Sequence, residues 1–181
     1  MTDDPDRNEA IPILYDAWSE FKTISKHRMV HHYLPKLEIS LRALNQDMIW
    51  QKELQLMNSI GGIVLHITEH VMRNTTRLLQ PDAVFTKGIE NSFPDLNMTQ
   101  DQLIHHLTEV FTAFEKAINT VDINDMYSIY HLVEHTGYHL GQIVDRAQRM
   151  TGVQFQFVQN GIHESALKQG IEREYNDKEA E

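Results

Sequence analysis

The chain has 181 residues, a length that fits one domain with a core large enough to fold without disulfides or a structural metal. It contains no cysteine, which excludes disulfides, cysteine-ligated zinc and a cysteine nucleophile. Its net charge of −10 and its lack of a Lys/Arg block argue against a nucleic-acid partner.

Signals for export or membrane insertion are also missing. The first residues, Met-Thr-Asp-Asp-Pro-Asp-Arg, are acidic and do not precede an apolar stretch, which argues against a secretory signal. No apolar run approaches the roughly eighteen residues that cross a bilayer. We therefore expect a cytoplasmic protein with no membrane partner.

The N-terminal quarter predicts a loose lead-in followed by an interrupted helix. Residues 1 to about 12 are polar and contain two prolines, whereas residues from about 14 to 45 show a helical pattern. Pro35 lies inside that pattern, where it removes one backbone hydrogen bond and clashes with the preceding turn. We therefore expect either a kink near Tyr33 or two abutting helices.

A second helix is predicted from about Ile60 to Leu79. Ser59 is a favourable N-cap for it. Gly61 and Gly62 in its first turn allow two interpretations, a frayed start or a close contact with a neighbouring element. The following segment, residues 81 to 97, reads as a long loop because it contains two prolines and a glycine, and loops of this length often form lids or binding loops.

Two further helices are predicted after this loop. The pattern Thr99-Gln-Asp-Gln102 is a capping box that opens the third helix. Asp122 or Asn124 is expected to cap the fourth, which runs to about residue 150 and ends at Gly152.

The pattern as a whole predicts an all-α helical bundle within a single domain, residues 1 to 181. The bundle is expected at about residues 14 to 150, with a long loop between the second and third helices. Residues 151 to 181 form a C-terminal extension that includes one short helix, at about 165 to 175.

Histidines are spaced four apart in two of the predicted helices. His131, His135 and His139 lie in the fourth helix, and His66 and His70 lie in the second. Side chains four residues apart project from one helix face, so a pair of imidazoles can bind the same metal ion. A third ligand would then come from the other helix.

Periodicity alone does not decide which histidines act as ligands. With 11 histidines in the chain, some pairs at this spacing arise by chance. The helical phase places His139 at the edge of the apolar stripe of the fourth helix, with His135 and His131 further round. These side chains therefore face water or line a polar pocket, and the choice between His66 and His70 also stays open.

Three stretches of sequence resemble the DinB-like superfamily, in its branch of small bacillary proteins. The similarity spans roughly residues 28 to 150. The stretches are His32-Tyr-Leu-Pro-Lys-Leu-Glu38, Asn58-Ser-Ile-Gly-Gly-Ile-Val-Leu-His66 and His135-Thr-Gly-Tyr-His139-Leu-Gly-Gln-Ile143.

The resemblance implies an antiparallel four-helix bundle with a three-histidine metal centre. By correspondence of motifs, the metal ligands are His66, His135 and His139, with His70 as a polar neighbour. Three protein ligands leave an open coordination position, which is typical of catalytic sites. Imidazole ligands suit divalent Zn, Ni, Cu or Fe.

The resemblance also implies a metal-dependent enzyme acting on a small-molecule substrate. The expected reaction is either hydrolysis or transfer of a low-molecular-weight thiol such as bacillithiol, with the metal activating water or the thiol. Glu69 or Glu134, each next to an expected ligand, is a candidate to orient an imidazole or act as a base. The alternative is a non-catalytic metal-binding or stress-associated protein.

A second apolar row on the second helix predicts association. Leu65, Met72 and Leu79 follow heptad spacing on the side away from the main stripe. One stripe packs inside the bundle, so the other needs a neighbouring helix or a second subunit. Because the resembling proteins often pair through a helix face, we expect a homodimer.

Overall fold

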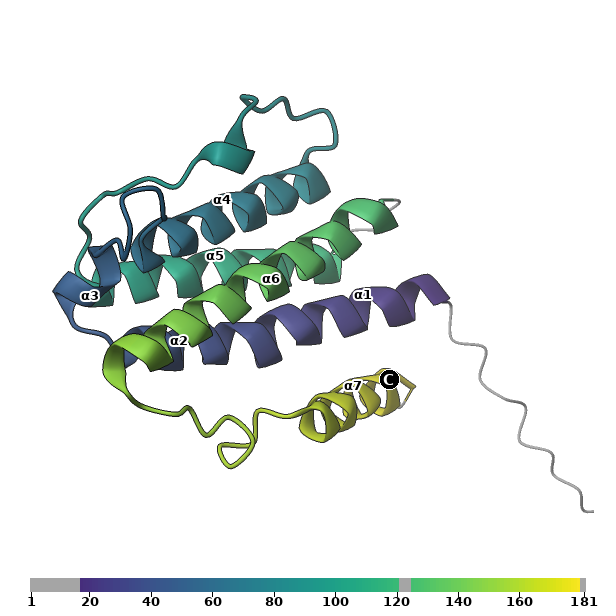
Figure 1. Ribbon diagram of the computed structural model, residues 1–181. Helices are drawn as coiled ribbons and strands as arrows, with labels where there is room; N and C mark the ends of the chain where they lie inside the picture. Colours follow the sequence, from purple (N-terminus) through teal and green to yellow (C-terminus); the bar gives the residue numbers. More distant parts are fainter. Residues whose placement is uncertain (1–16, 121–124, 180–181) are drawn as a thin grey trace, which may run out of the picture.

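The computed structural model describes residues 17 to 120 and 125 to 179, and the described part of the chain contains helices and no strand. Figure 1 shows these helices gathered into a bundle in which α4, α5, α6 and the α1–α2 arm lie side by side. The elements are α1 (Ala17–His27), η1 (Arg28–Tyr33), α2 (Leu34–Arg42), α3 (Gln46–Trp50), α4 (Ile60–Leu79), η2 (Ile89–Asn91), α5 (Gln100–Thr120), α6 (Met126–Thr151) and α7 (Glu164–Glu179). The expected all-α bundle is thus confirmed, while the lead-in at residues 1 to 12 lies outside the described residues.

The interrupted first helix contains a π-helical segment. Instead of a sharp kink, η1 continues α1 directly into α2, and Pro35 lies in the first turn of α2. Because α1, η1 and α2 are contiguous, Pro35 removes a hydrogen bond from the middle of a helical arm. The Leu34 N–H just before it donates to the Met29 carbonyl five residues back, so the ladder is already in the π-helical pattern where proline interrupts it. The π-helical turn of η1, which is wider than an α-helical turn, therefore accommodates the break in backbone hydrogen bonding that was predicted at Pro35.

The glycine pair at the start of α4 is a site of close contact. The Gly62 N–H donates to Ser59 Oγ at 3.0 Å, which confirms the predicted cap. A Cβ on residue 61 would lie 2.6 Å from the Trp50 ring, and one on residue 62 would lie 3.3 Å from the Phe93 carbonyl oxygen. Glycine is required at position 61 because the indole packs directly on the helix backbone.

The caps of α5 and α6 follow the sequence with one change. Thr99 and Gln102 bond each other reciprocally, as a capping box requires. Asp125 caps α6, and its carboxylate accepts from the Ser128 N–H at 3.0 Å. The predicted caps Asp122 and Asn124 lie outside the described residues.

The buried face of α6 is rotated toward His139 relative to the predicted apolar stripe, which comprises Met126, Ile129, Val133, Gly137, Leu140, Val144 and Ala147. Met126 is 45% exposed, and Val133 and Val144 are only half-buried. Leu132, Thr136 and Ile143 are buried although they lie off that stripe, and His139 is only 6% exposed. Because α6 packs against α4 on one side and against α1, η1 and α2 on the other, it buries more than one row of side chains. The histidine turn of α6 therefore faces the interior.

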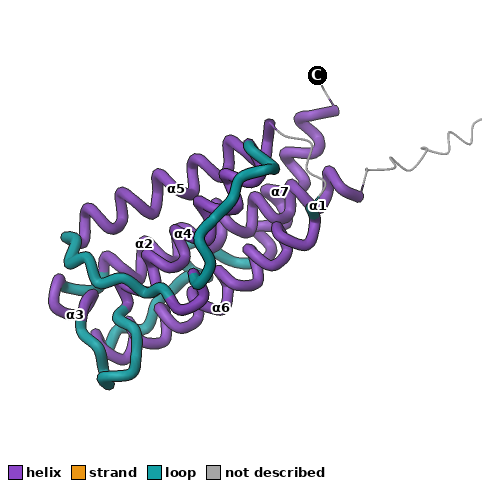
Figure 2. The backbone as a smooth tube through the Cα atoms, turned by 90° about the horizontal axis from the view of Figure 1, so that it is seen from above, coloured by secondary structure: helices purple, strands orange, loops and turns teal. Residues whose placement is uncertain are grey.

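Two long connections lie on the outside of the bundle. Figure 2 shows the segment between α4 and α5 running along the outer side of α4. The C-terminal extension carries α7 back to α1 and η1, which confirms a helix in this region and extends it to Glu164–Glu179 (Figure 1).

The second apolar row of α4 is divided between interior and surface. Leu65 is 6% exposed and belongs to the core, whereas Met72 and Leu79 are 43% and 57% exposed. The three residues therefore do not form one exposed face, because α4 packs against both α5 and α6 and this packing covers Leu65. None of the helices in the described part of the chain combines the length and apolar content needed to cross a bilayer.

Candidate metal centre

Four histidines from α4 and α6 meet inside the bundle. His66 and His70 come from α4, and His135 and His139 come from α6. The His70 and His135 rings are 4.0 Å apart between centroids, and the His66 ring lies within 5.0 Å of the other three. The predicted assembly of one site from two histidine-bearing helices is therefore present as a geometric arrangement, which we call the histidine cluster.

The three imidazoles whose nitrogens converge are not all the predicted ones. One nitrogen from each of His66, His70 and His135 lies within 4.8 Å of the others, a spacing that suits a shared metal ion. His139 lies beside this group, with its ring 4.5 Å from that of His135. His70, expected only as a neighbour, thus joins the group. His131 is exposed at the edge, 5.8 Å from His135 between ring centroids.

His66 is fixed by the loop that covers α4. Its Nδ1–H donates to the Ser92 carbonyl oxygen at 3.0 Å, and its ring stacks on Phe93 with centroids 4.2 Å apart. A carbonyl oxygen only accepts hydrogen bonds, so Nδ1 holds the proton and Nε2 presents its lone pair. This is the tautomer that a metal ligand needs, and orienting contacts of this kind are common around bound metals.

His139 is oriented in the same way from within α6. Its Nδ1–H donates to Gln142 Oε1 at 2.9 Å, which leaves the Nε2 lone pair free to accept or to bind a metal. Sequence reasoning did not assign a role to Gln142 or Ser92. Gln142 lies three residues after His139, a spacing at which helical side chains meet, so it was detectable. The contact of Ser92 was not detectable from the sequence, because the path that a loop takes over a helix leaves no periodic pattern of residues.

All four imidazoles are held in the neutral form. Burial, reinforced by the neighbouring imidazoles, lowers the pKa of His70 to about 4 and that of His135 to about 3. Burial also lowers the pKa values of His66 and His139. Because a metal binds neutral imidazole, the cluster is ready for a metal at neutral pH without loss of a proton.

The two central nitrogens have the separation of ligands on one ion. His66 Nε2 and His135 Nε2 are 3.1 Å apart and share a hydrogen bond, in which His135 donates because the proton of His66 is on Nδ1. A metal bound between them would take the place of that proton. Two nitrogens bound at metal–nitrogen distances of about 2.0–2.1 Å in a tetrahedron lie about 3.3 Å apart. Moreover, His70 Nε2 and His135 Nδ1 are buried without a hydrogen-bond partner in the described structure. Because buried polar atoms are rarely unpaired, the cluster fits a bound cation.

The carboxylates suggested by the sequence do not contact the cluster. Glu69 pairs with Arg73 at 2.7 Å on the outer side of α4, and Glu134 is exposed on α6. Residues adjacent on a helix point in different directions, so neither orients an imidazole here. The orienting acceptors are the Ser92 carbonyl and the Gln142 side chain instead.

A cavity of about 430 Å³ lies between α4 and the covering loop. The lining includes Leu65 and Glu69 of α4 and Thr86 and Ser92 of the loop, but none of the four cluster histidines. Ser92 is common to both places, because its carbonyl accepts from His66. The segment predicted as a binding loop therefore borders a cavity. Ser92 lies between this cavity and the histidine cluster.

Comparison with protein-family models, curated proteins and solved structures finds no match for this chain. The resemblance to the DinB-like superfamily therefore stays a prediction that rests on the three motifs.

Proposed function

We propose that the histidine cluster binds one divalent transition-metal ion, with His66 and His135 as the central ligands. The 3.1 Å separation of their Nε2 atoms is the observation that supports this best. His139 is the third ligand implied by the resemblance, and its Nδ1–H bond to Gln142 presents the required lone pair. His70 is the other candidate, since its nitrogens meet those of the central pair.

We further propose that the helices form the antiparallel four-helix bundle that the resemblance implies. Metal sites in such bundles are commonly built from side chains on facing helices. The adjacency of α4 and α6, which supply all four imidazoles, supports this arrangement.

The function proposed for the site is metal-dependent chemistry on a small molecule, either transfer of a low-molecular-weight thiol or hydrolysis. A divalent metal would supply Lewis-acid activation of the thiol or water. His70 and His135 are half-buried and His131 is exposed, which supports access by a substrate from this end of the cluster. Since the chain contains no cysteine, a thiol would enter as a cosubstrate.

A closed, non-catalytic metal site is the second candidate. Four imidazoles together can complete a tetrahedral shell and exclude substrate. The buried, unpaired His70 Nε2 favours this alternative. X-ray absorption of the metal-loaded protein separates the two, because scattering from the outer ring atoms counts the bound imidazoles. Three imidazoles plus an exchangeable oxygen ligand indicate an open site, and four imidazoles indicate a closed one.

The metal proposal is tested by elemental analysis of protein purified without a polyhistidine tag. We expect about one divalent metal per chain, and we expect His66→Ala or His135→Ala to lose most of it because too few ligands remain. His105→Ala is the matched control, since this exposed side chain pairs only with Glu109. Full metal content in the His66→Ala/His135→Ala double variant would refute the site.

The single variants His70→Ala and His139→Ala identify the third ligand. If the assignment from the resemblance holds, His139→Ala loses the metal and His70→Ala keeps it. The loaded protein is then screened with thiols and small electrophiles, with His135→Ala as the inactive control. Equal turnover by the His135→Ala variant would show that any activity does not depend on the cluster.

A further inference from the structure

A second cavity, this one lined by several histidines, lies where the C-terminal extension packs on the bundle. It has a volume of about 330 Å³ and is separate from the histidine cluster. Its walls include His27, His31 and His32 on the first helical arm and His163, Gly170 and Arg173 on the C-terminal extension.

The π-helical turn explains why three histidines of one arm reach the same cavity. In an α-helix, His31 would share a face with His27, whereas His32 would point well away from it. The i→i+5 repeat of a π-helix brings residues five apart into register, so His27 and His32 also align. Short π-helical segments occur frequently at functional sites. The local geometry therefore assembles a polar wall that an unbroken α-helix would not provide.

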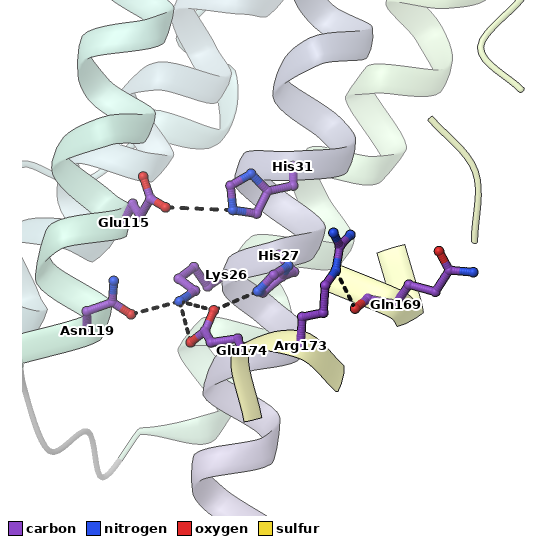
Figure 3. Close-up of polar contacts among 8 residues, drawn as sticks. All are labelled: Lys26, His27, His31, Glu115, Asn119, Gln169, Arg173 and Glu174. Carbon is purple, nitrogen blue, oxygen red and sulfur yellow. Dashed lines mark hydrogen bonds and ion pairs between the residues drawn. The ribbon is translucent and has the colours of Figure 1, made fainter. Parts of the chain in front are cut away.

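The surroundings of this cavity are more cationic than the chain as a whole. Figure 3 shows Glu174 of α7 reaching Lys26 and His27, with Arg173 beside His27. Arg173 lines the cavity, and no carboxylate of the described residues does. Lys26 and Arg28 lie next to lining residues and are paired with Glu174 and Glu164. The lining itself therefore carries a cation, in contrast with the net charge of −10 for the chain.

The two inner histidines are buried and neutral. His27 and His32 are 7% and 4% exposed. Burial, together with Lys36 and Arg28, lowers the pKa of His32 to about 4, and burial lowers that of His27 although Glu174 opposes the effect. Burial is the largest cause of the lowered pKa of His32; the two cations that add to it, Lys36 and Arg28, would also attract an anion.

The cavity is kept open by a small residue on α7. A Cβ on residue 170 would lie 3.3 Å from His27 Nδ1, so glycine leaves that side of the imidazole uncovered. Lys36 Nζ donates to His32 Nε2 at 2.8 Å, so an ammonium group lies directly behind a lining imidazole. Side chains of both the first arm and α7 therefore line one open cavity.

We propose that this cavity binds a small molecule through an oxyanion group, a phosphate or a carboxylate, held between the histidines of the first arm and Arg173. The bound anion would accept hydrogen bonds from the Arg173 guanidinium and from the Nδ1–H of His32, whose Nε2 accepts from Lys36. The Nε2–H of His27 is already donated to Glu174, so His27 would form the wall of the site rather than a donor. The site does not depend on the metal proposal, because no residue of the histidine cluster lines it.

The test is an NMR titration of the full chain with sulfate, with ionic strength held constant by chloride. Sulfate is a dianion throughout the accessible pH range, so its own charge does not change. We expect saturable shifts of the His27 and His32 ring signals at pH 6, with dissociation in the millimolar range. An absence of saturable shifts would overturn the proposal. A parallel acetate titration shows whether carboxylates share the site.

Two charge-matched variants of α7 make the test specific. Arg173→Gln should weaken sulfate binding about tenfold, because it removes a charge-assisted hydrogen bond. Lys168→Gln removes the same charge from an exposed position that pairs only with Glu172, and should leave binding unchanged. Equal affinity in Arg173→Gln and the parent protein would refute the assigned ligand.

The pH dependence provides an independent readout. An anion stabilises protonated His32, so sulfate affinity should rise as the pH falls from 7 to 5, toward the pKa of about 4 of this imidazole. The charged or titratable groups that face His32 are Arg28, Lys36, Glu164 and His163. Equal affinity at the two pH values would contradict the part assigned to this imidazole.

Discussion

At the residue scale, hydrogen bonds to the imidazoles decide which nitrogen faces the centre of the histidine cluster. Gln142 accepts the Nδ1 proton of His139 and so fixes its Nε2 lone pair. If His139 is a ligand, Gln142→Ala should weaken metal binding by about 10–100-fold, the usual effect of losing an orienting partner. Gly141→Ala, at the adjacent position, is the control because nothing lies within 4 Å of the Cβ that alanine would add there. Competition with a fluorescent chelator measures both affinities.

Proton binding to the buried histidines also sets a pH limit on folding. The folded-state pKa values of His32, His70 and His135, about 4, 4 and 3, lie below the unfolded value of about 6.5. The unfolded chain therefore binds more protons between pH 6.5 and about 4, and stability falls as the pH drops through that range. Each histidine that stays neutral in the folded state contributes a loss of up to about 1.4 kcal/mol per pH unit.

Urea unfolding of the metal-free protein measures this loss directly. The midpoint should decrease from pH 7 to pH 5, and His70→Gln should reduce the slope because one proton-linked group is gone. A midpoint that stays constant over this range would contradict neutral burial. The same lowered pKa values imply that metal binding persists to a lower pH than the ordinary imidazole value near 6.5 would allow.

At the element scale, the start of α4 depends on a close contact between backbone and ring. A methyl group at position 61 would lie 2.6 Å from the Trp50 ring, which is held by its Nε1–H bond to the Met98 carbonyl. Gly61→Ala should therefore destabilise the protein by about 1–3 kcal/mol, the usual range for overpacking. Gly141→Ala, in open space on α6, should instead stabilise it by about 0.5–1 kcal/mol. Urea midpoints that move in the same direction for both variants would refute this account.

At the scale of the whole molecule, the homodimer stays a prediction. Only Met72 and Leu79 of the proposed apolar row are exposed, since Leu65 packs in the core. If these two side chains form the contact, Met72→Glu/Leu79→Glu should convert a dimer of 21.1 kDa chains into a monomer, because charges would be buried without partners. Sedimentation velocity at micromolar concentration measures the mass. A monomeric parent protein would refute the dimer and leave the histidine cluster unaffected.

The sequence by itself determined the parts that depend on local physics. The Ser59 cap, the Thr99–Gln102 capping box and the apolar periodicity fixed where α4 and α5 begin, because caps and periodicity act within one or two turns. The same local spacing placed His66, His70, His131, His135 and His139 among the candidate ligands, and only the resemblance selected His66, His135 and His139. The π-helical turn was not predictable, since Pro35 indicates a disruption but not its form.

Only the tertiary structure decided what faces the site from elsewhere in the chain. It brought His70 into the group of converging nitrogens and placed the Ser92 carbonyl, 26 residues from His66, on its ring. It also turned Glu69 outward and formed the cavity between the histidines of the first arm and α7. These features arise from the packing of helices and loops, and the direction of a side chain relative to a distant element is set by that packing rather than by its neighbours in sequence.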